Sequence, residues 1–184
     1  MEPRTLAIGV MVLCFAAAEG AANDWLTLAL IDGYDAPHWV GVAGFALFVA
    51  SMTTGRLLGA SLLDRVGRVP VLIGTGVVAA AGVLLVVFGS MAPVVAAGVL
   101  LWGLGAALGF PVGISAAADD PRGAARRVGV VSTVGYGAFL FGPPLMGALG
   151  DRVGTLDALF AVVGVMAVAV VAVPQARRQE PAAG

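Results

Sequence analysis

Three polar residues that could bind a proton or a solute lie inside the first apolar stretch of the chain. Glu19, Asn23 and Asp24 interrupt a run that is otherwise apolar from Leu6 to Leu30. An ionised group at mid-bilayer costs at least ~2.5–3.5 kcal/mol on insertion scales, so it needs a partner or a function. Glu19 and Asn23 are four residues apart and share a helix face, whereas Asp24 points about 140° away from Glu19.

These residues leave alternatives open. Glu19 could be a carboxylate that couples proton uptake to transport or binds solute, or a hydrogen-bonded group that holds helices together. For Asp24 a structural role is favoured, because a short outward shift would place it in water. Trp102 and Tyr136 lie in later apolar stretches and could line a polar passage, although such residues more often pack or form interhelical hydrogen bonds.

Arg56 is a cation within the second apolar stretch, eight residues before Asp64. Helical rise places it roughly 12 Å inside the membrane end of that stretch. An ion pair with Glu19 would have to bridge a depth difference of about 10 Å by the same rise. We therefore expect Arg56 to extend toward the interface or to pair with Asp64.

The elements that must position these residues are six apolar stretches. The chain of 184 residues is 60% hydrophobic and 11% charged, with a mean hydropathy of +1.00, which excludes a soluble domain. Each stretch is long enough to cross a bilayer. We predict an all-α polytopic membrane protein, a six-transmembrane-helix bundle over residues 1–174, with a disordered cytoplasmic tail at 175–184. The spans are Leu6–Leu30, Trp39–Leu63, Val69–Phe88, Val94–Ala118, Val128–Leu149 and Leu156–Val173.

The arginines indicate orientation, because loops that stay in the cytoplasm retain positive charge. Eight fall on one side of the predicted spans, whereas Arg152 alone falls on the other. This predicts that both termini lie in the cytoplasm. The absence of lysine, beside much Ala, Gly and Val, is typical of a GC-rich bacterial gene, so we expect a multi-pass protein of the bacterial inner membrane. A single cysteine cannot form an internal disulfide, and a single histidine cannot build a metal site by itself. We expect no cofactor. The net charge of −1 gives no basic surface of the kind that binds nucleic acid.

The first stretch could also be a signal peptide, because Arg4 precedes an apolar run and Ala16–Ala18 offers small residues for cleavage. Its apolar character continues to Leu30 and five more stretches follow, which favours a retained helix.

Glycines and prolines predict how the spans pack and bend. Gly105, Gly109 and Gly113 recur every four residues, which is typical of a close helix-packing seam. Prolines inside a span remove backbone donors, kink the helix and free carbonyls that neighbours or water must satisfy. The predicted kinks lie at Pro111 and at Gly142, Pro143 and Pro144.

The loop between the second and third stretches carries a recognisable motif, A-S-L-L-D-R-V-G-R-V-P at residues 60–70. It resembles the G-x-x-x-D-[RK]-x-G-R-[RK] signature of the major facilitator superfamily, with Ala60 and Val69 as departures. Gly67 would allow a tight turn, the arginines would hold the loop at the cytoplasmic face, and Asp64 could cap a helix. The predicted gating loop is therefore Asp64, Arg65, Gly67 and Arg68.

Three more segments extend the resemblance, namely residues 18–25, 52–59 and 135–144, which are similar to the seventh, eighth and eleventh helices of facilitators. The resemblance implies the C-terminal six-helix half of a secondary transporter, which moves a small solute by alternating access and could be proton-coupled. It also implies a lipid bilayer and a second six-helix half as partners, supplied by a separate chain or another copy. In complete facilitators the loop aspartate faces that other half, so Asp64 could lack its partner here.

Two functions other than transport are a membrane scaffold and an intramembrane protease. A truncated or non-transporting scaffold, or a regulatory remnant of a transporter, remains an alternative. Gly113–Ala116 weakly resembles the nucleophile turn of intramembrane serine proteases, but the sixth stretch has no histidine to take the serine proton, and His38 falls in an outer loop. We therefore expect no enzyme.

Overall fold

The computed structural model describes residues 2–177, and all of their regular secondary structure is helical. The helices are α1 (Pro3–Tyr34), α2 (His38–Val66), α3 (Arg68–Phe88), α4 (Ala92–Ala106), α5 (Gly109–Ala117), α6 (Ala124–Val153), α7 (Thr155–Ala158) and α8 (Phe160–Ala172), followed by the 3-10 helix Val173–Ala176. They form six segments long and apolar enough to cross a membrane, with α4–α5 and α7–η1 each counting as one. The predicted fold class is confirmed.

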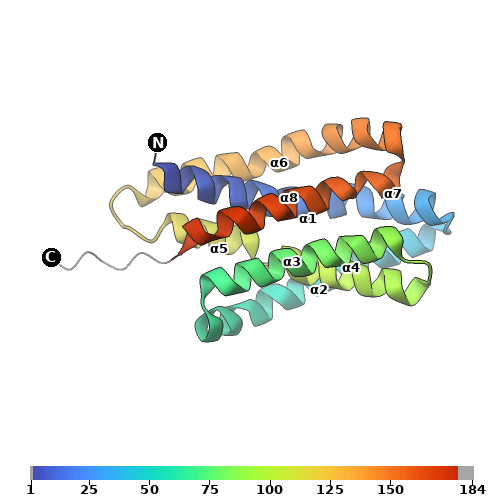
Figure 1. The fold of residues 1–184 in the computed structure, drawn as a ribbon, viewed down its shortest axis with the longest axis horizontal. Coiled ribbons are helices and arrows are strands. Elements are labelled where there is room, and N and C mark those ends of the chain that lie inside the picture. The colour runs from blue at the N-terminus through green and yellow to red at the C-terminus, as the bar shows by residue number, and fades with distance from the viewer. Residues whose placement is uncertain (1, 178–184) are drawn as a thin grey trace.

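The helices run up and down, so the beginning of α1 and the 3-10 helix meet at one end of the bundle (Figure 1). We call this the terminal end and the opposite one the far end. Most helices are longer than the apolar stretches that predicted them, because their polar outer turns continue the helix beyond the apolar residues.

The fourth span is broken where the sequence predicted a kink. The ring of Pro111 excludes the carbonyl of Ala107 four residues earlier and offers it no N–H. The helix accordingly stops at Ala106 and resumes at Gly109. Pro143 and Pro144 behave differently, because α6 continues through both of them.

Small residues bring the helices together. A Cβ on Gly105 would lie 2.3 Å from the backbone nitrogen of Ala79, and one on Gly109 would lie 1.9 Å from the Phe15 ring. Gly113 approaches Val12 in the same way, at 2.1 Å. All three distances are too short for a side chain, so the repeat is a packing seam between the fourth span and helices α1 and α3.

Burial is uneven among the helices. Helix α1 packs against α2, α5, α6 and α8 and is the most buried span. In the most apolar window of each span, 67% of α1 is buried, compared with 22% of α2 and 17% of α6. Two long helices therefore leave much of their surface without a partner among residues 2–177. We call the surface formed by α1, α2, α5 and α6 the open side.

The predicted tail needs a correction at its start. Gln175 and Ala176 belong to the 3-10 helix, and Ala176 is fully buried. Arg4 Nε donates to the Gln175 carbonyl at 3.1 Å, so these residues are held by α1 and are not disordered. Arg177 follows without regular secondary structure, and residues 178–184 of the predicted tail lie outside the described residues.

Candidate functional site

An ion pair joins α1 and α2 near the middle of the bundle. Arg56 Nη2 donates to Glu19 Oε1 at 3.1 Å and to Oε2 at 3.0 Å. The Glu19 side chain is 15% exposed, whereas that of Arg56 is 44% exposed. The carboxylate is thus mostly covered, and the guanidinium remains accessible from one side.

This pair corrects the expectation that Arg56 extends to the interface or pairs with Asp64. That expectation counted helical rise from the apolar boundaries and assumed that the two helices start level. Helix α1 instead extends farther toward the terminal end than the turn between α2 and α3 (Figure 1). This axial offset brings Glu19 to the level of Arg56.

The broken fourth span supplies a third member of the site. Arg56 Nε donates to the Ala107 carbonyl at 3.3 Å. This is the carbonyl that Pro111 deprives of its helical N–H donor. The guanidinium is therefore fixed on two sides, by a carboxylate of α1 and by the helix break between α4 and α5.

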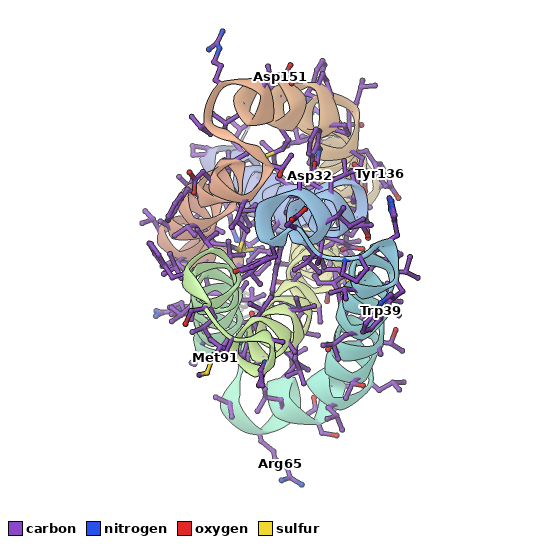
Figure 2. The ribbon with its side chains drawn as sticks, turned by 90° about the vertical axis from the view of Figure 1, so that its right-hand side faces the viewer. Asp32, Trp39, Arg65, Met91, Tyr136 and Asp151 are labelled. Carbon is purple, nitrogen blue, oxygen red and sulfur yellow. The ribbon has the colours of Figure 1, made fainter. Side chains whose placement is uncertain are left out.

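Aromatic side chains of α5 and α6 lie on the same open side. The rings of Phe110 and Tyr136 have centroids 5.5 Å apart, and Tyr136 is 61% exposed. Phe139 packs against Gly20, next to Glu19, at a distance of 3.2 Å from a Cβ built there. Figure 2 shows Tyr136 of α6 on the same side of the bundle as Trp39 of α2.

The remaining predicted residues of α1 are exposed. Asn23 lies one turn beyond Glu19 on the same helix face. Asp24 is also exposed and forms no ion pair with any residue that the structure describes. Asn23 therefore belongs to the surface that carries Glu19, whereas the 140° turn to Asp24 separates it from that surface.

Trp102 corrects another expectation. Its side chain is fully buried and packs edge-to-face on Phe48, with ring centroids 5.7 Å apart. It lies in the core where α4 meets α2 and α3, so it does not line the open side in this conformation.

A cavity of about 980 Å³ extends from Arg56 toward the terminal end. Its polar lining comes from Arg56, Asp64, Arg68, Ser115 and Arg177, and the rest is apolar. Asp64 is exposed and pairs with no described cation, and α3 begins without a side-chain cap. The cavity thus places Arg56 on one continuous surface with three residues of the predicted gating loop, Asp64, Gly67 and Arg68.

The loop itself turns within a single residue. Gly67 ends α2 and begins α3 with φ of +90°, a conformation that glycine adopts without strain. This agrees with the predicted need for glycine at the turn. In the end-on view of Figure 2, the Arg65 side chain points away from the bundle.

Arg68 is the centre of a second polar cluster, which closes the terminal end. It donates to both carboxylate oxygens of Asp119, at 2.8 and 3.2 Å, and to Ser115 Oγ at 3.3 Å. Arg4 also donates to Asp119, at 3.2 Å. Further donations from the two arginines reach backbone carbonyls of residues 175–177. We call Arg4, Arg68, Ser115 and Asp119 the terminal cluster.

The sequence analysis missed Asp119 and Arg4 as interacting residues. The available signal was an acidic residue on the side of the chain that holds eight of the ten arginines. The sequence does not show which arginines Asp119 binds. Asp119 lies in a predicted loop, and its partners depend on how α1, α3, α5 and the 3-10 helix converge at the terminal end.

Comparison with known proteins decides the family. The sequence profile described as Major Facilitator Superfamily matches residues 8–183. The chain belongs to the major facilitator superfamily. The resemblance seen in the loop motif and in three helices is thereby confirmed, and the chain is a multi-pass membrane protein of a transporter family.

Three bacterial relatives support this membership. The uncharacterized transporter y4wD of Sinorhizobium fredii is 34% identical over 87% of this chain, and the membrane protein MosC of Rhizobium meliloti is 31% identical over 88%. An uncharacterized MFS-type transporter of Yersinia pestis is 31% identical over 92%. The matched region covers 42%, 40% and 45% of these relatives, so the chain spans less than half of their length.

A solved structure shows the same fold. The crystal structure of the POT family transporter PepTSo superimposes with a TM-score of 0.81 at 20% sequence identity. The match covers 94% of this chain and 37% of that transporter. The six-helix arrangement is therefore that of one part of a facilitator.

Proposed function

We propose that this chain acts as one half of a secondary active transporter, which moves a small solute across a bacterial inner membrane by alternating access. The observation that carries the proposal is the mid-bundle pair of Glu19 and Arg56 on the open side, held beside a helix break. Matching chains more than twice as long are consistent with a second six-helix half that would cover this side.

In this proposal Glu19 is the coupling group. Protonation of its carboxyl would remove the charge that holds Arg56, and the Ala107 carbonyl would keep the guanidinium in place. A solute could then bind the exposed guanidinium, with Asn23 and Tyr136 beside it. Charges inside a membrane protein mark such pathways because burying them without a function is costly.

The terminal end is the cytoplasmic side in this proposal. Arg4, Arg65 and Arg68 all lie there, together with Arg122 before α6 and the two arginines in the first turn of α6, and the cytoplasmic side of membrane proteins retains such residues. The cavity between Arg56 and Arg68 would then be the inward path, with Asp64 at its rim facing the second half.

Reconstitution tests the proposal. The chain would be placed in vesicles with and without a complementary six-helix half, and solute-dependent proton movement would be measured with an internal pH dye. We expect movement only with both halves. We also expect Glu19→Gln to abolish proton movement at unchanged expression, while Asp32→Asn, an exposed carboxylate on the same helix, leaves it intact.

The alternative is a non-transporting scaffold or a regulatory remnant of a transporter. Absence of solute and proton movement with every partner tested would support the scaffold. If solute-dependent proton movement is unchanged in Glu19→Gln, the chain is still a transporter half, but Glu19 is not its coupling group.

A further inference from the structure

A second apolar surface lies away from the open side, where α2 and α3 diverge. Both helices pack on α4 but contact each other little. A groove of about 770 Å³ remains between them, with Leu101 and Leu104 of α4 among the residues of its floor. No residue of α1 or α6 lines this groove.

The walls are almost entirely apolar. Leu58 and Leu62 of α2 are 65% and 45% exposed, and they face Val71 and Val78 of α3. Gly74 of α3 widens the groove, because a Cβ built there meets no atom within 4 Å. The volume and the mostly apolar lining of the groove suit a hydrocarbon chain.

The mouth of the groove carries a cation. Arg65, in the last turn of α2, lines the groove at the terminal end and forms no ion pair with any described residue. In the view along the bundle its side chain points sideways, away from the other helices (Figure 2).

We propose that this groove binds an anionic phospholipid, with an acyl chain between α2 and α3 and the phosphate on Arg65. Charge complementarity selects this occupant, because a free guanidinium stands beside an apolar channel that opens at its level. An arginine near an anionic surface contributes about 1 kcal/mol, which corresponds to about fivefold in affinity. The proposal is independent of transport.

Native mass spectrometry of the 184-residue chain tests the proposal, with phosphatidylglycerol and phosphatidylcholine of identical acyl chains added in turn. We expect about fivefold preference for phosphatidylglycerol. Arg65→Gln should bring the preference close to one. Its matched control is Arg152→Gln, because Arg152 also lies in the last turn of a long helix but at the far end, and this variant should keep the preference.

The groove itself is tested by filling it. Gly74→Leu should reduce retention of both lipids at least severalfold without disturbing the fold, since its side chain enters open space. Gly164→Leu on α8 also enters open space and should have no effect. Thermal unfolding of each variant checks that the helices remain packed.

Three results would overturn the proposal. Equal retention of both lipids by the unsubstituted chain would remove the anionic preference. If glycerol phosphate competes for the site as strongly as the phospholipid does, then only the exposed charge of Arg65 binds the phosphate and the groove contributes nothing. A dimer that Gly74→Leu converts into a monomer would show that the groove is covered by a second copy of this chain.

Discussion

Two arginine–carboxylate clusters occupy this bundle, and they differ in how completely they are enclosed. In the terminal cluster, the side chains of Arg4, Arg68 and Asp119 are 19%, 16% and 10% exposed. In the mid-bundle pair, Glu19 is similarly covered but Arg56 is 44% exposed. The first cluster is enclosed by partners from the same chain, whereas the second presents a charged group to the open side.

We infer from this difference that the terminal cluster has a structural role, whereas the mid-bundle pair can bind a ligand. In the terminal cluster one carboxylate binds two arginines, and backbone carbonyls of residues 175–177 accept three further hydrogen bonds, so the charged groups are covered by partners from the same chain. In the mid-bundle pair one arginine binds one carboxylate and one carbonyl, and it keeps donors free. We expect substitutions in the first to affect stability and substitutions in the second to affect function.

The largest loss of stability is expected for Asp119→Asn. The change leaves two covered arginines without their shared counter-charge, and breaking such a pair costs about 3 kcal/mol or more. Unfolding of the purified chain in mixed micelles would measure the loss. Asp120→Asn is the control, because Asp120 accepts one hydrogen bond from the Arg122 backbone and should cost about 1 kcal/mol or less.

Glu19→Gln should cost less stability than Asp119→Asn, because Arg56 is 44% exposed, keeps its bond to the Ala107 carbonyl, and can still donate to the glutamine oxygen. The same unfolding assay would show it. A loss as large as that of Asp119→Asn would contradict the distinction between the clusters and make the pair a structural element.

The smallest effect is expected for Ser115→Ala, which removes one acceptor of Arg68 while Asp119 keeps both of its bonds. We expect a loss of about 0.5 kcal/mol. A loss comparable to that of Asp119→Asn would mean that the hydroxyl, and not the carboxylate, holds the terminal end.

The sequence predicted the six spans, the turn at Gly67 and the break near Pro111, because a bilayer fixes helix length and these residues act on their own backbone. Contacts between helices were harder to predict from the sequence. The pairing of Arg56 with Glu19 depends on the axial offset of α1, which residue counting does not contain. The burial of Trp102 depends on which face of α4 packs inward, and α4 is apolar on every face.

The most direct test asks whether the open side is an interior surface of a larger transporter. Tyr136→Cys on α6 and Val171→Cys on α8 place thiols at positions that are 61% and 80% exposed, and the native Cys14 is buried. A membrane-impermeant maleimide would be applied to the chain in vesicles, with and without the complementary half. We predict that both thiols stay unreactive in lipid when the chain is alone, and that the second half makes the thiol at 136 reactive by enclosing it in a hydrated cleft, while the thiol at 171 stays unreactive. Equal behaviour of the two thiols in both preparations would contradict the account.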